Sequence, residues 1–194
     1  MKFDRCMEKK QKGFSLVELL VTIAIISILV AASVPAIIRW LPDYRLKMAA
    51  RDLFSRLQQA KIQSARSSTE CGVLFNNANN TYQVVSGGPD GVYGVGGDDV
   101  TRGTTPLAGY GSGVRFGSGQ ATQSVGGVVF GAETTWDYPF IAGNFVVFDP
   151  NGTMFETGYV YLRNNDGTSF AVGTPTLAGS IVLRKWYSAG GGWD

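Results

Sequence analysis

No histidine occurs anywhere in the 194 residues of this chain. Histidine is the usual general base near neutral pH and a common ligand of zinc. Its absence excludes catalytic sites that pair a serine or a cysteine with histidine, and it leaves a zinc site without its normal ligands. The composition therefore argues against an enzyme.

Cysteine is nearly absent as well, since the chain contains only Cys6 and Cys71. Two cysteines so far apart do not predict the disulfide framework of a small stabilised fold. Cys71 lies in a predicted strand, where we expect a small buried apolar side chain. The chain also lacks the G-x-x-x-x-G-K-[ST] loop that binds nucleotide phosphates, so another protein would have to supply energy from ATP.

Net charge is small, at +2, which is too little to indicate a polyanionic partner. The chain has 17 basic and 15 acidic residues, and residues 1–13 hold five of the basic but only two of the acidic ones. The remainder carries 12 basic and 13 acidic residues. The basic excess is therefore confined to the N-terminal end, directly before a long apolar run.

This apolar run covers residues 14–38, FSLVELLVTIAIISILVAASVPAII, and its single charged residue is Glu18. At about 1.5 Å per residue, a helix of this length spans a hydrocarbon core of roughly 30 Å. A cleaved secretory signal would have a shorter apolar region and a small-residue cleavage site after it, which is lacking beyond Val34. A membrane anchor fits better, with the basic leader retained in the cytoplasm.

A simple membrane anchor does not account for a charged residue, Glu18, inside the apolar run. A carboxylate inside lipid costs about 2.5–3.5 kcal/mol at mid-membrane and less near the interface, so it is expected to have a partner. The surrounding sequence KGFSLVEL (residues 12–19) strongly resembles the processing signal of type IV prepilins and pseudopilins. The resemblance implies that a prepilin peptidase removes residues 1–13 by cutting after Gly13, and that Phe14 is then N-methylated. It also implies that Glu18 meets the N-terminal ammonium of a neighbouring subunit during assembly.

The chemistry of these residues agrees with the implied roles. A glycine before the cut leaves a protease free access to the backbone. Cleavage creates a positive amine at the start of an apolar helix, and an amine and a carboxylate in a low-dielectric layer are far less costly together than apart. Glu18 would thereby select the register in which subunits stack.

The apolar helix is expected to continue beyond the membrane. Pro35 removes one backbone hydrogen bond, so it predicts a kink or local melting of the helix, as in many pilins. Residues 39–66 predict an amphipathic continuation, because Leu46, Ala50, Leu53, Leu57 and Ala60 recur at three- and four-residue steps. This stripe should pack on a sheet of the same subunit.

Residues 67–194 predict a β-rich head domain. Its strand candidates are 70–76, 81–86, 113–116, 126–130, 144–149, 158–163, 169–173 and 180–187. Turn signals separate them at 77–80, 149–152 and 164–167. The predicted fold class is α+β and pilin-like, with a long N-terminal helix, transmembrane in its first half, packed on an antiparallel sheet.

The second half of the chain resembles a more specific type of pilin head domain. A strand ending in phenylalanine, the turn DPNGT (149–153), the segment GYVYLRN (158–164) and the late SIVLRKW (180–186) together look like the GspH/FimT-type head domain. That resemblance implies a minor subunit of a type II secretion pseudopilus or of a type IV pilus. Residues 87–143 carry no recognised pattern.

Two ligand hypotheses stay open beside this assignment. Some FimT-type pilins bind DNA through a basic C-terminal region, and Arg163, Arg184 and Lys185 are the candidates for such contacts here. The glycine that starts the family's basic pattern is followed by Ser180 instead of arginine, so nucleic acid is not the expected partner. The loop at 87–99 gathers Asp90, Asp98 and Asp99 among glycines and is a candidate calcium site, although its spacing does not follow an EF-hand.

The sequence therefore predicts a single-pass protein of the bacterial inner membrane, with its N-terminus cytoplasmic and its head periplasmic before it joins a filament. Implied partners are other pilin or pseudopilin subunits, the prepilin peptidase and the inner-membrane assembly platform. No cofactor is expected. The alternatives are a simple anchored binding protein and a membrane-tethered hydrolase. For a hydrolase, the close acidic pair would be Glu133 and Asp137, but nothing in the sequence around them indicates catalysis.

Overall fold

The computed structural model describes residues 13–126 and 144–194 of the chain. The chain divides into two compact units, residues 1–40 and 41–194. The predicted strand at 126–130 and the acidic pair Glu133 and Asp137 fall almost wholly outside the described residues.

The long helix predicted from the N-terminal half is confirmed. Helix α1 covers Leu16–Ser67, a run of 52 residues that contains no glycine. Helical geometry continues without a break through Pro35, so the backbone is not melted there, and the kink stays a prediction. The helix ends next to Ser68, whose φ of 54° is left-handed, and Arg66 in the last turn complements the negative end of the helix dipole.

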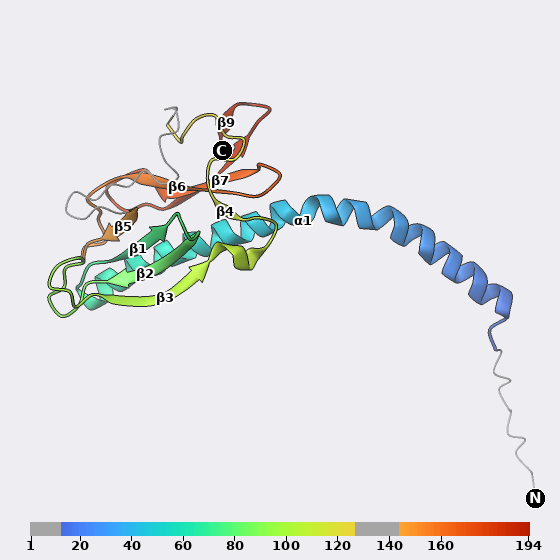
Figure 1. Ribbon diagram of the computed structural model, residues 1–194, viewed down its shortest axis with the longest axis horizontal. Coiled ribbons are helices and arrows are strands. Elements are labelled where there is room, and N and C mark those ends of the chain that lie inside the picture. Colours follow the sequence, from blue (N-terminus) through green and yellow to red (C-terminus); the bar gives the residue numbers. More distant parts are fainter. Residues whose placement is uncertain (1–12, 127–143) are drawn as a thin grey trace, which may run out of the picture. The chain divides into compact units, whose positions relative to one another are not determined.

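Two antiparallel sheets form the rest of the second unit (Figure 1). The first has the strand order β3-β2-β1-β5, and the second has the order β4-β6-β7-β8-β9. The strands of the first are β1 Cys71–Asn76, β2 Thr81–Ser86, β3 Val100–Pro106 and β5 Phe145–Phe148. Those of the second are β4 Arg115–Phe116, β6 Gly158–Arg163, β7 Ser169–Thr174, β8 Val182–Tyr187 and β9 Gly192–Trp193. A short 3-10 helix, η1, spans Leu107–Tyr110.

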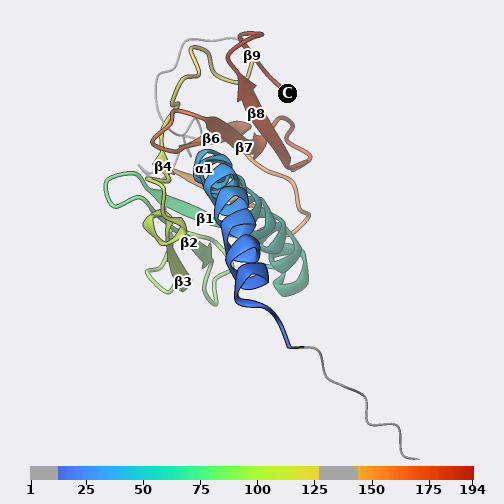
Figure 2. The same ribbon diagram turned by 90° about the vertical axis from the view of Figure 1, so that its right-hand side faces the viewer.

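The C-terminal part of α1 supplies the centre of the core. Its buried residues follow the predicted stripe and extend it: Leu46, Ala49, Ala50, Leu53, Leu57, Ala60 and Ser64. They share one cluster with side chains of both sheets, among them Val73 of β1 and Val160 of β6. Figure 2 looks roughly along this helix, with β6, β7 and β8 drawn above it and β1, β2 and β3 to its left. Each buried leucine contributes about 1.5–3 kcal/mol, so this face holds the head together.

Two polar contacts fix α1 against the sheets. The Asp52 carboxylate accepts hydrogen bonds from the hydroxyls of Tyr82, at 2.5 Å, and Tyr110, at 2.9 Å. Near the start of this unit, Asp43 accepts one from the Asn164 amide at 3.0 Å and one from Thr168 at 2.6 Å. Burial raises the pKa of the Tyr82 hydroxyl, and the hydrogen bond to Asp52 raises it further. The hydroxyl therefore stays protonated near neutral pH and keeps donating to Asp52.

Most strand predictions are confirmed, and their hairpins have the expected turns. Asn80, at the end of the first hairpin turn, has a φ of 50°, a conformation that asparagine tolerates better than most residues. In the turn after β5, the Asp149 carboxylate accepts bonds from the amides of Asn151 and Thr153. Burial opposes its ionisation, but these bonds outweigh burial and lower the pKa of Asp149.

Two strands were missed, and the predicted strand at 113–116 is reduced to half its length. Strand β3 lies at the edge of its sheet and is exposed almost throughout, so VTRGTTP shows none of the alternation that marks a half-buried strand. Strand β9 has two residues and no pattern of its own. The predicted strand at 113–116 shortens to Arg115–Phe116, because Gly113 has a φ of 67° that a strand does not accommodate.

Candidate functional site

The predicted processing site lies in a short extended stretch before α1. Gly13 precedes the helix, and a Cβ atom placed on it would meet nothing within 4 Å. The next side chain, Phe14, is 83% exposed. Among the described residues, nothing lies close to Gly13, so the peptide bond between the two residues is accessible.

Ser15 starts the helix. Its hydroxyl accepts a hydrogen bond from the Glu18 amide at 3.1 Å, and its carbonyl accepts one from Leu19 at 3.1 Å. This is the arrangement of an N-cap, which satisfies backbone donors that have no partner inside the helix. The sequence carries the signal for this cap as S-x-x-E at residues 15–18, which is a capping-box pattern.

Glu18 uses only its backbone in this cap. A complete capping box would have the glutamate carboxylate reach back to the Ser15 amide. Among the described residues, the Glu18 side chain forms neither a hydrogen bond nor a salt bridge. A carboxylate thus stands unpaired on a helix whose neighbouring side chains, Val17 and Leu19, are apolar and more than half exposed.

The helix surface around Glu18 is apolar and uncovered. Every residue from 13 to 40 is exposed, including the leucines and isoleucines of the apolar run. Within the described parts of the chain, α1 is the one helix long and apolar enough to cross a membrane. Its few hydroxyls are satisfied internally, because Thr22, Ser27 and Ser33 each donate to a carbonyl one turn earlier.

The acidic loop directs its carboxylates to its own backbone. Asp90 accepts a bond from the Val92 amide at 3.0 Å, and Asp99 accepts from Gly94 at 2.9 Å. Asp98 accepts a longer bond, 3.4 Å, from the amide of Asp90. No cluster of three acidic, histidine or cysteine residues suited to a metal occurs in the described residues. The calcium hypothesis rests on the sequence alone.

The three basic candidates for DNA contact do not share one face of their sheet. Residues paired across antiparallel strands point to the same side. Lys185 pairs with Phe170, whereas Arg184 pairs with Ala171, which in turn pairs with Tyr161. Arg163 is two residues from Tyr161, so Arg163 and Arg184 lie on one face and Lys185 lies on the other.

Aromatic side chains beside these residues are engaged inside the protein. Trp186 is 6% exposed and stacks edge-on against Trp193 of β9, with ring centres 5.4 Å apart. The Lys185 ammonium lies 5.9 Å from the ring of Phe170 and 5.5 Å from that of Tyr187. Tyr187, at 49% exposure, offers a half-exposed ring for stacking next to Lys185.

Comparison with known proteins gives one match to a family description. Residues 9–34 match the prokaryotic N-terminal methylation motif. No curated protein matches the chain significantly. Among solved structures, the chain is similar to the minor pseudopilin EpsH from the Type 2 Secretion System of Vibrio cholerae, with a TM-score of 0.48 and 11% identity. That alignment covers 72% of this chain and 95% of that one.

The matched motif contains the residues whose geometry is described above, namely Gly13, Phe14 and Glu18. Behind it, one long apolar helix packs on antiparallel sheets, as predicted for this class. The motif and the apolar helix together indicate anchoring in the inner membrane. On these findings, the chain carries the prokaryotic N-terminal methylation motif at the start of a long apolar helix, whose C-terminal part packs on two antiparallel sheets.

Proposed function

We propose that the chain is a minor pilin-type subunit of the GspH/FimT kind. It is cut after Gly13, N-methylated on Phe14 and assembled into a type II secretion pseudopilus or a type IV pilus. The observation that carries this proposal is the unpaired Glu18 carboxylate on an exposed apolar helix, five residues after an accessible glycine.

Processing supplies the partner that Glu18 lacks. Hydrolysis of the bond after Gly13 leaves Phe14 with a positively charged amine, next to the positive end of the α1 dipole. That amine is costly to hold in an apolar layer, and so is the carboxylate of Glu18. Pairing the amine of one subunit with the Glu18 carboxylate of its neighbour neutralises both charges.

Such a pair would fix the register of assembly. Apolar side chains do not discriminate between a helix and lipid, because lipid tails are as apolar as leucine. Residues 14–38 can therefore pack against neighbours in several registers of similar energy. Only the register that brings Phe14 and Glu18 together avoids two unpaired charges in a low-dielectric layer.

The topology follows from the distribution of charge. Residues 1–13 hold five basic side chains and would stay in the cytoplasm, which places the head in the periplasm. The partners would be the prepilin peptidase, an inner-membrane assembly platform with its own ATPase, and other subunits. The head would act by shape and surface contacts, without catalysis or a cofactor.

Two alternatives differ from this proposal, one in what the head binds and the other in whether the leader is removed. A FimT-type pilus subunit would bind DNA through the C-terminal strands, for which Arg163 and Arg184 share one sheet face. A simple anchored binding protein would retain residues 1–13.

The test is the intact mass and N-terminal sequence of the full chain, expressed with and without a prepilin peptidase. We expect a mature chain that begins at Phe14 and is heavier by one methyl group when the peptidase is present. A Gly13→Val variant should stay uncut, because its side chain obstructs the protease. A wild-type chain that remains uncut beside an active peptidase would leave the anchored-protein alternative.

A further inference from the structure

A basic groove lies between α1 and the edge of the first sheet, at a distance in sequence from the processing site. Seven residues line it, and we call it the arginine groove: Arg56, Gln59, Ile62, Gln63, Arg66, Val84 and Arg102. Its volume is about 400 Å³, within the range of roughly 300–1,000 Å³ typical of ligand pockets.

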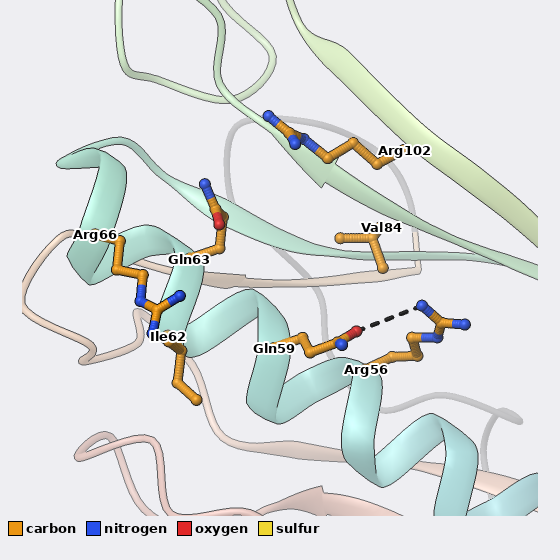
Figure 3. A pocket seen from close by; sticks show the side chains of 7 residues that line it. All are labelled: Arg56, Gln59, Ile62, Gln63, Arg66, Val84 and Arg102. Carbon is orange, nitrogen blue, oxygen red and sulfur yellow. Dashed lines mark hydrogen bonds between the residues drawn. The ribbon is translucent and has the colours of Figure 1, made fainter.

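The fold forms this groove from three elements. Arg56, Gln59, Gln63 and Arg66 follow one another at three- and four-residue steps, so they share one face of α1. Val84 of β2 lies opposite, and Arg102 extends from the edge strand β3. Figure 3 shows the helix residues on one side, with Val84 and Arg102 across from them.

The groove has positive charge that the head does not neutralise. Arg56 is partly compensated, since it lies 3.8 Å from Asp52 and hydrogen-bonds Gln59 at 3.4 Å. For Arg66 and Arg102, no hydrogen bond or ion pair of the side chain occurs among the described residues. Both are exposed, and no carboxylate lines the groove. Three arginines therefore line one groove of a chain whose predicted mature part is nearly neutral.

We propose that the arginine groove binds an acidic, extended peptide segment of a partner protein. Guanidinium groups bind carboxylates through two parallel hydrogen bonds, which gives both affinity and orientation. The amides of Gln59 and Gln63 can donate to and accept from a peptide backbone. Ile62, 52% exposed, and Val84 add apolar surface to the lining.

The lining favours a peptide over a nucleic acid. Proteins that bind single strands combine basic side chains with aromatic rings on which bases stack, and stacking is worth about 1–3 kcal/mol per base. None of the seven lining residues is aromatic. The groove thus offers contacts to carboxylates and to a backbone, but no surface for a base.

The spacing of the arginines sets the pattern of the segment. Arg56 and Arg66 are ten residues apart on α1, which corresponds to about 15 Å along the helix. An extended chain covers this length with roughly four to five residues. The segment should therefore carry acidic residues about four positions apart. This surface lies outside residues 14–38, so the proposal goes beyond the filament function and does not depend on it.

The experiment measures fluorescence anisotropy of a dye-labelled peptide of six glutamates, titrated with the full chain in zwitterionic detergent micelles. We expect saturable binding that the double substitution Arg66→Glu/Arg102→Glu weakens at least about tenfold. The matched control is Lys47→Glu/Arg51→Glu, which makes the same change in net charge on exposed positions of α1 outside the groove. The control should bind nearly as well as wild type.

Three outcomes would overturn the proposal. These are no binding to the wild-type chain, equal weakening by the control, and tighter binding of a single-stranded oligonucleotide with the same number of charges. If the double reversal lowers the thermal midpoint of the head, the neutral pair Arg66→Gln/Arg102→Gln repeats the test without new negative charge. None of these measurements involves cleavage or assembly, so their failure leaves the proposed filament function untouched.

Discussion

In the proposed function, the Glu18 side chain sets the register in which the apolar helices of neighbouring subunits pack. We expect Glu18→Gln to leave cleavage after Gly13 intact, because the cut precedes the helix and the Ser15 cap uses only the Glu18 backbone. Assembly should fail, since a neutral amide cannot balance the Phe14 amine. The measurement is the share of the subunit in sheared filaments beside the intact mass of the membrane-bound chain. Incorporation equal to wild type would refute the role assigned to Glu18.

Glu70 is a second carboxylate whose surroundings disfavour its charge, because it is buried near other acidic residues. It is 8% exposed and accepts a hydrogen bond from the Tyr93 amide at 2.9 Å. Burial raises the pKa of this carboxyl, and the bond from Tyr93 partly opposes the rise. Three nearby carboxylates raise it further: Asp149, Asp90 and Asp99. The folded head therefore disfavours the charged form of Glu70 relative to the unfolded chain.

The sign of the pH effect follows from that raised pKa. As pH rises from the ordinary value of 4.5 through the raised pKa, the folded state loses stability relative to the unfolded chain. We expect Glu70→Gln to raise the thermal midpoint of the head at pH 7 and to have little effect at pH 4, where both side chains are neutral. Thermal unfolding by circular dichroism at the two pH values checks this. A loss of stability at pH 7 that is absent at pH 4 would contradict this expectation, because it would show that the hydrogen bond from Tyr93 needs the charged carboxylate.

At the scale of elements, the C-terminal half of α1 carries the core. Leu53 is fully buried in the cluster between the two sheets. Leu53→Ala should lower the free energy of unfolding by about 2–5 kcal/mol, because it removes apolar contacts and leaves a cavity. Gln58→Ala, on the exposed side of the same helix, should change it by less than about 0.5 kcal/mol. Denaturant titration of the head followed by tryptophan fluorescence measures both, and equal effects would contradict the assigned packing.

Elements with a strong period were predictable, and elements without one were not. The stripe from Leu46 to Ala60 repeats at helical spacing, and the asparagines before Thr81 mark a hairpin, so both were predicted within a few residues. Strand β3 depends on its pairing with β2 and has little apolar pattern of its own. The arginine groove was missed for the same reason, because Arg102 approaches α1 only through that pairing.

The candidate site at the N-terminus was predictable because its signal is local. Gly13, Phe14 and Glu18 fall within six residues, and their meaning depends on neighbours in sequence. The C-terminal basic residues depend instead on sheet register. Arg184 and Lys185 are adjacent in sequence, and the strand conformation places adjacent side chains on opposite faces.

At the scale of the whole molecule, the head has a core that does not use the apolar segment. Every buried residue of the main cluster lies between Leu46 and Val172. We therefore expect the fragment 41–194 to fold and to unfold cooperatively without detergent, with a midpoint close to that of the head in the full chain. Circular dichroism melting curves of the two provide the test. A fragment without a cooperative transition would show that the membrane segment is needed for folding.

The reactivity of the Cys71 thiol can report how often strand β1 separates from its neighbours. Cys71 is 1% exposed and sits in β1, paired with Ser86 of β2 on one side and Phe148 of β5 on the other. In a chain cut after Gly13, as proposed, Cys71 is the one remaining cysteine of the sequence. A thiol reagent can then react only when the central strand separates from its neighbours, so the labelling rate counts these events without any introduced probe. Binding partners that stabilise the closed head would lower the labelling rate of Cys71, and partners that favour strand separation would raise it.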